Sequence, residues 1–233
     1  MTGRAAKHTD HNFESELAEV RDRILLMGAH VEGLVSASVR ALVERDSELS
    51  RATLESDREI DELELSIDEL CLRVLARRQP VASDLRFIAT SLKLVTDLER
   101  MADLGVNICE RVLELNDEAP LRPYVDLVNM AEVAQEMVRE ALDAFVERDA
   151  ARARRVLERD DVLDAQYDQT FRELLTYMME DPRNIYRATR IQSVAKYLER
   201  IGDHATNVAE MVVFMIDGED IRHARRHEPP RPR

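Results

Sequence analysis

Tryptophan is absent from this sequence, and aromatic residues of all kinds make up only 4% of it. Glycine and proline are also scarce, with 6 and 7 copies in 233 residues. Runs of β-branched and aromatic residues that alternate with polar ones, as β-strands require, are hard to find. Leucine, alanine, glutamate and arginine dominate instead, and this composition favours long helices. The sequence therefore predicts an all-α protein.

Cysteine is nearly absent as well. Cys71 and Cys109 both lie within helical patterns, which excludes a disulfide framework and zinc-ligand spacing and predicts two small core residues in a reducing compartment. The first ten residues contain no apolar segment of the kind found in signal peptides. The longest unbroken apolar run, Met211–Ile216, is too short to span a bilayer. We therefore expect a cytoplasmic protein.

Basic residues are too few to balance the acidic ones, and the formal net charge is −14. This charge argues against sequence-independent binding to nucleic acid, because a phosphate backbone attracts basic surfaces. It is compatible with binding to metal cations or to basic protein surfaces. It is equally compatible with a role of the acidic residues in solubility alone.

Apolar residues at helical spacing predict six helices, three on each side of a linker at residues 116–123 that contains two prolines. The expected ranges are 13–42, 49–77 and 83–115, then 124–147, 151–180 and 184–217. Pro80 and Pro182 break the pattern, Ser83 or Asp84 is expected to cap the third helix, and Gly218 is expected to end the last. The predicted domains are residues 11–118 and 122–218. The basic, proline-rich segment 219–233 is predicted to be a disordered tail.

The two halves of the chain repeat each other. The pattern Leu-Glu-Arg-[Met/Ile]-[Ala/Gly]-Asp occurs at Leu98–Asp103 and again 100 positions later at Leu198–Asp203. Val-Glu-Arg-Asp occurs at Val43–Asp46 and again at Val146–Asp149. The repeat predicts two tandem, pseudo-symmetric three-helix bundles.

Each half carries one stripe of oxygen donors on a helix, because residues at this spacing fall on one face at ~100° per residue. The stripes consist of Glu99, Asp103, Asn107 and Glu110 in the first half and Glu199, Asp203, Asn207 and Glu210 in the second. Aspartate pairs on the preceding helices, which antiparallel packing could place beside the stripes, are Asp57 with Asp61 and Asp160 with Asp164. Hard oxygen ligands suit Fe, Mn or Mg, and less readily Ca or Zn. We predict these twelve residues as ligands of divalent or trivalent metal ions.

The alternative is a solvated charged face, since spaced acidic pairs are common in a chain that is 34% charged. The duplication favours function, because ordinary surface charges have no reason to keep identity and spacing in both halves. Arg100 and Arg200 could neutralise the carboxylates when metal is absent, or contact a partner. His204 has no histidine counterpart in the first half, and we interpret it as a boundary residue.

Motifs of known catalytic sites are missing from the sequence. It has no Glu-x-x-His pair of the di-iron type, no His-Glu-x-x-His, no phosphate-binding glycine loop and no nucleophile elbow. We therefore predict that the protein is not an enzyme. A metal-dependent hydrolase or a metal-storage protein that uses the same stripes remains the alternative.

The paired Leu-Glu-Arg signature resembles that of the PhoU family of phosphate-signalling proteins. The similarity extends to Met27–Glu32 in the first helix, to Asp84–Ile88 at the start of the third, and to Tyr197–Asn207. The first copy departs from the family pattern only in Ala102, where glycine is usual.

The resemblance implies two three-helix bundles related by a pseudo-twofold axis, with carboxylate clusters that hold iron, zinc or other metals. It implies a cytoplasmic negative regulator of phosphate uptake and of the phosphate-starvation response. Such a regulator would act as an adaptor between the ATPase subunit of the phosphate ABC transporter and a sensor histidine kinase. It also implies a homodimer that reaches the membrane only through its protein partners.

Overall fold

The computed structural model describes the backbone of residues 3–121 and 125–221 and the side chains of residues 12–121 and 126–221. Three helices form the first half of the chain, namely α1 (Gly3–Glu44), α2 (Ser47–Arg77) and α3 (Ala82–Asn116). The second half repeats them as α4 (Val125–Glu147), α5 (Ala150–Glu180) and α6 (Ile185–Asp217), with a short 3₁₀ turn, η1 (Pro182–Asn184), before α6. The described residues contain no strand, and the predicted all-α architecture of two like bundles is confirmed.

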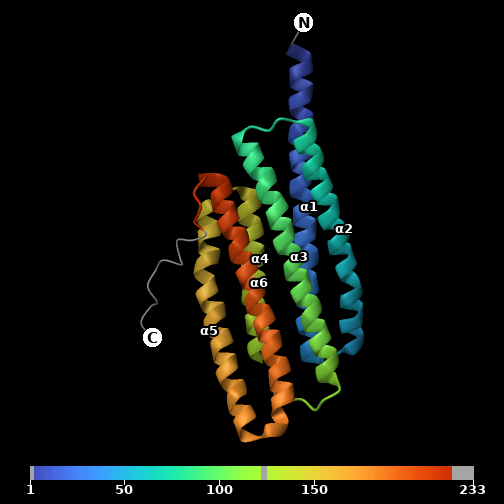
Figure 1. Cartoon of the computed structure of the whole chain (residues 1–233), viewed down its shortest axis with the longest axis vertical. Helices are drawn as coiled ribbons and strands as arrows, with labels where there is room; N and C mark the ends of the chain where they lie inside the picture. The colour runs from blue at the N-terminus through green and yellow to red at the C-terminus, as the bar shows by residue number, and fades with distance from the viewer. Residues whose placement is uncertain (1–2, 122–124, 222–233) are drawn as a thin grey trace.

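The two bundles lie side by side (Figure 1), with α3 and α6 adjacent and antiparallel in front, α1 and α4 behind, and α2 and α5 at the outer edges. Buried residues of all six helices form one continuous hydrophobic core. The two bundles are therefore joined through α3 against α6 and α1 against α4, and neither closes its own separate core. The predicted domain boundaries stay a prediction.

The repeated Val-Glu-Arg-Asp sequence forms the turn between the first two helices of each bundle. Arg45 and Arg148 both have φ 55°, in the left-handed region that ends a helix. The N–H of Asp46 then donates to the Ala41 carbonyl at 2.9 Å, as in a Schellman motif. The Asp46 carboxylate accepts hydrogen bonds from the first turn of α2, and Asp149 does the same for α5. The repeat thus encodes one helix stop followed directly by one helix start.

Two helices, α3 and α1, begin at residues other than those that the sequence predicts. The predicted cap of α3 at Ser83 or Asp84 is wrong, because the helix begins at Ala82 and its N-cap, Val81, offers no side-chain hydrogen bond. Val81 has an extended backbone directly before the helix, which places both polar residues inside the first turn. Helix α1 begins at Gly3, ten residues earlier than expected.

At the other end of the chain, Gly218 stops α6 with φ 73°, as predicted. Ile221, which we assigned to the tail, is partly buried against the core. The remainder of the predicted disordered tail, 222–233, lies outside the described residues.

The cysteines are core residues, as predicted. Cys71 and Cys109 are both free and buried. Burial raises the pKa of the Cys71 thiol to about 12 and that of Cys109 to about 11. Neither thiol is therefore activated as a nucleophile.

One stretch of α1, Asn12–Glu44, is long and apolar enough to cross a membrane by length and composition alone. Its most apolar window has a mean hydropathy of 1.2, and half of that window is buried against the rest of the protein. Core helices commonly meet the same criterion, so the stretch is weak evidence for a membrane span.

Candidate metal centre

Five acidic side chains of the first bundle influence one another across the α2–α3 contact. We call them the first carboxylate cluster: Asp57, Asp61 and Glu64 of α2, and Glu99 and Asp103 of α3. Burial raises the pKa of Glu99, and the negative charges of Asp103, Glu64 and Asp61 raise it further. Burial likewise raises the pKa of Asp57, with Asp61 and Asp103 adding to the effect. The structure therefore brings the predicted aspartate pair of α2 beside the stripe of α3.

Arg100 provides the positive charge nearest to this cluster. Its Nε lies 3.4 Å from Glu99 Oε2 and its Nη1 lies 3.0 Å from Asp103 Oδ2. The guanidinium is 57% exposed, so it lies at the rim of the cluster. This geometry agrees with the predicted role of Arg100 as a neutralising residue.

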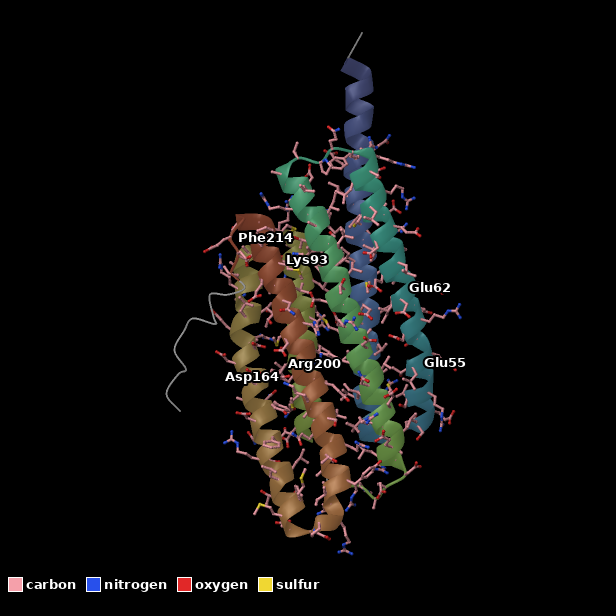
Figure 2. All side chains as sticks on the ribbon, viewed as in Figure 1. Glu55, Glu62, Lys93, Asp164, Arg200 and Phe214 are labelled. Carbon is pink, nitrogen blue, oxygen red and sulfur yellow. The ribbon has the colours of Figure 1, made fainter. Side chains whose placement is uncertain are left out.

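The second bundle carries a smaller group of the same kind. We call Asp164 of α5 with Glu199 and Asp203 of α6 the second carboxylate cluster. Burial raises the pKa of Asp164 and of Asp203, and the Glu199 charge is the next largest cause for both. Figure 2 shows Asp164 on α5 and Arg200 on α6 at similar heights on neighbouring helices.

The cation beside the second cluster is Lys196, not Arg200. Lys196 Nζ lies 2.6 Å from the Glu199 carboxylate and 5.3 Å from the centre of the Tyr167 ring. Arg200 forms no ion pair with any described side chain, so its predicted neutralising role is not seen. The equivalents of Lys196 and Tyr167 in the first bundle are Thr96 and Glu64.

The remaining predicted ligands lie outside the two clusters. Glu110 is exposed and pairs with Arg111 at 3.2 Å, while Asn107 and Glu210 are partly buried. Asp160 lies one turn from Asp164 along α5, but it is not among the charges that raise the pKa of Asp164 or Asp203. Asn207 faces the other bundle, where its Nδ2 donates to Asp97 Oδ1 at 3.3 Å. In each stripe, therefore, the first glutamate and the aspartate face the outer helix of their own bundle, and the other two members lie outside the cluster.

The contact that holds Asn207 also includes His204. Its Nδ1 lies 2.7 Å from Asp97 Oδ1, with both side chains mostly buried between α6 and α3. This is the boundary position that we expected for His204, and its contact with Asp97 joins the two bundles. The equivalent positions, Leu104 and Tyr197, cannot form such a pair.

The sequence argument missed Glu64, Lys196 and Asp97. Glu64 follows Asp61 by three residues and Lys196 precedes Glu199 by three, so helical spacing could have found both. They were missed because neither residue has a like counterpart in the other half. Asp97 directly precedes the Leu-Glu-Arg signature, but no sequence signal identifies its partners, since they come from the other bundle.

The donor chemistry of the clusters fits a hard cation. Crowded carboxylates whose pKa values are raised by mutual repulsion favour a nearby positive charge. Glu199 Oε2 is buried and lies 2.6 Å from Lys196 Nζ, yet it accepts no well-oriented hydrogen bond. Among the described residues, however, no group of three or more His, Cys, Asp or Glu side chains is close enough to hold a metal ion. A cation would therefore have to draw the carboxylates together and displace Arg100 or Lys196.

Comparison with known proteins identifies relatives over most of the chain. A family model described as the PhoU domain matches residues 24–112 and 127–212. The phosphate-specific transport system accessory protein PhoU homolog of Pseudomonas putida is 45% identical over 217 residues, which cover 93% of this chain and 85% of that protein. The accessory protein PhoU of Escherichia coli K12 is 35% identical, with 93% and 90% covered.

Solved structures of PhoU proteins are also similar to this chain. The crystal structure of PhoU from Pseudomonas aeruginosa is similar with a TM-score of 0.85 at 45% identity, over 89% of this chain and 100% of that one. The phosphate transport system regulatory protein PhoU from Streptococcus pneumoniae is similar with a TM-score of 0.83 at 29% identity, over 89% and 98%. Both comparisons extend across the two bundles.

Proposed function

The chain belongs to the PhoU family, and from this premise we propose that it is an accessory protein of a phosphate-specific transport system. In this role it restrains phosphate uptake and the phosphate-starvation response. The observation that carries the proposal is identity of 35–45% to accessory proteins of such systems over 93% of the chain. The presence of the signature in both halves supports it.

We propose further that the protein acts by contact with other proteins and not by catalysis. It would link the ATPase subunit of the phosphate ABC transporter to a sensor histidine kinase, in the cytoplasm and as a homodimer. The absence of known catalytic motifs from the sequence supports this reading, and so do the long helices, whose outer faces offer extended docking surfaces. The net charge of −14 favours partners with basic surfaces.

The metal proposal concerns the two carboxylate clusters. We propose that Fe, Zn, Mn or Mg binds there, with ligands drawn from the carboxylates of Asp57, Asp61, Glu99 and Asp103 in one bundle and Asp164, Glu199 and Asp203 in the other. A bound cation would cancel the repulsion between α2 and α3, and between α5 and α6. Metal would in this way stiffen the surfaces that partners contact.

The deciding experiment is deletion of the gene, followed by growth in phosphate-rich medium. We expect phosphate-starvation genes to be expressed despite the phosphate, and the full-length protein to restore repression. The tagged protein should also recover the transporter ATPase or the sensor kinase. Normal repression in the deletion strain, with neither partner recovered, would refute the proposal. Phosphoester hydrolysis that depends on Glu99 and Glu199 would favour the metal-dependent hydrolase instead.

A further inference from the structure

A groove runs between α1 and α4, the two helices that lie behind α3 and α6 in Figure 1. It consists of two adjoining cavities of about 380 and 320 Å³. Both are lined by Ser36 of α1 and Gln135 of α4, so they form one continuous depression. From Leu25 to Val43 the groove follows α1 for about 27 Å at ~1.5 Å per residue.

The groove has the pseudo-twofold symmetry of the chain. Leu25 in the first cavity is equivalent to Val128 in the second, and Leu142 in the first is equivalent to Val39 in the second. The two ends therefore offer similar apolar walls. Such a surface suits an elongated occupant that lies along the whole groove.

Gly33 on the wall of the first cavity has no structural explanation within this chain. A Cβ added at Gly28 or Gly105 would clash with a leucine of another helix, whereas a Cβ on Gly33 would meet nothing within 4 Å. An exposed glycine inside a helix destabilises that helix relative to alanine. A glycine at this position permits the backbone of a partner to approach α1 closely.

The groove carries charged side chains of both signs. Arg139 and Glu32 form an ion pair at 2.8 Å across the first cavity. In the second cavity Arg40 of α1 and Glu132 of α4 are exposed, and neither forms an ion pair with a described side chain. An occupant is therefore expected to carry one acidic and one basic side chain beside an apolar strip.

We infer that this groove is the docking site of a single amphipathic α-helix from a partner protein. A helix of about 18 residues matches the groove length. Its apolar residues at i, i+3 or i+4, and i+7 would pack on the exposed side chains of Leu25 and Val43, over a floor formed by the buried Val39 and Leu142. Its acid would lie toward Arg40 and its base toward Glu132. A second copy of this chain is a poorer occupant, because two concave faces do not fill each other. The groove would then be a contact surface of the adaptor. That a partner protein exists at all rests on the proposed function.

The test uses the full chain and helix-locked peptides of about 18 residues, labelled for fluorescence anisotropy. One peptide carries a leucine strip with one glutamate and one lysine, a second replaces the glutamate with lysine, and a third replaces the leucines with serine. The first should bind about tenfold more tightly than the third. Gly33→Leu should weaken that binding about tenfold, and Ala52→Leu, at an exposed position on α2, should leave it unchanged. Arg40→Glu should reverse the preference between the first two peptides, whichever way the helix lies.

Circular dichroism and sedimentation of each variant complete the experiment. Equal binding by Gly33→Leu and the unaltered chain, or no change of preference in Arg40→Glu, would overturn the inference. Loss of a dimer in Gly33→Leu would also overturn it, in favour of a second copy in the groove. Peptide binding is measured without phosphate or a transporter, so normal repression in a deletion strain would refute the phosphate role and leave this result standing.

Discussion

The two carboxylate clusters share three acidic positions (Asp61 with Asp164, Glu99 with Glu199, and Asp103 with Asp203) but differ in the other residues. The first cluster contains five carboxylates, and its nearest cation, Arg100, lies exposed at the rim. The second contains three, and Lys196 reaches its most buried carboxylate, on Glu199, which is 13% exposed. The first bundle has Thr96 and Glu64 where the second has Lys196 and Tyr167.

Each bundle supplies one cation, but in the first an exposed arginine faces five carboxylates and in the second a lysine faces three, so the first cluster leaves more negative charge unbalanced. An internal lysine competes with any external cation for the same oxygens. We therefore expect the first cluster to be the stronger cation site. The predictions below test this difference between the halves, in order of expected effect.

Removing the acids of one bundle at a time should have the largest effect. Glu99→Ala with Asp103→Ala should lower the affinity for the tighter class of Mn²⁺ by about tenfold or more, because it removes the α3 side of the first cluster. Glu199→Ala with Asp203→Ala should lower the affinity only of a second, weaker class of Mn²⁺ sites. Isothermal titration calorimetry measures both, and equal losses in the two variants would show that the clusters do not differ.

Core glycines differ between the halves in a reciprocal way, since Gly105 corresponds to Ala205 and Gly202 to Ala102. A Cβ on Gly105 would clash with Leu34 of α1, and one on Gly202 would clash with Leu163 of α5. Each Gly→Ala change should lower the free energy of unfolding by about 1 kcal/mol, because overpacking outweighs the gain in helix propensity.

The control for these variants is Gly33→Ala, where a Cβ meets nothing. It should stabilise the protein by about 0.5–1 kcal/mol. Urea unfolding gives all three values. Stabilisation by Gly105→Ala or Gly202→Ala would mean that the neighbouring leucine moves aside at little cost.

Exchanging the counterion should make one cluster behave like the other. Lys196→Thr should raise the Mn²⁺ affinity of the second cluster about two- to fivefold, the equivalent of an exposed ion pair of about 0.5–1 kcal/mol. Thr96→Lys should lower the affinity of the first cluster by a similar factor. The two single variants are matched controls for each other, and effects of the same sign would contradict the comparison.

Acidification should produce the smallest effect. The pKa values of Asp57, Glu64, Glu99, Asp164 and Asp203 are raised above their ordinary values of 3.8 for Asp and 4.5 for Glu. The folded state therefore binds more protons than the unfolded state between those values and the raised ones, so stability decreases as pH rises through this window. These groups are only partly buried and solvent screens their charges, so we expect a gain of only about 0.5 kcal/mol between about pH 7 and about pH 5.

The control for the pH effect neutralises the clusters without removing their shape. The variant Glu99→Gln, Asp103→Asn, Glu199→Gln, Asp203→Asn should lose most of the gain, because fewer carboxylates repel each other. Chemical denaturation at both pH values measures it. A gain of the same size in this variant would place its origin in other residues.

The sequence predicted the six helices because their apolar spacing is regular and because two prolines and one glycine mark their ends. It predicted that Asp57 lies near Asp103 and Asp61 near Glu99 because the repeat identified all four and antiparallel packing brings α2 and α3 together. The start of α3 could not be predicted, since the extended backbone of Val81 competes with the side-chain caps that Ser83 and Asp84 would offer. The partners of Asn207 could not be predicted either, because they depend on how one bundle packs on the other.

The shared core has a consequence for the origin of the chain. A half severed at the linker would expose the apolar face of α3 that α6 now covers. The surface best shaped to cover it is the same face of another half, since the two halves already pair about a pseudo-twofold axis. A fragment of residues 1–121 should therefore associate as a symmetric homodimer of three-helix chains. The present protein is then the covalent form of such a dimer, and fusion freed each half to change its own counterion.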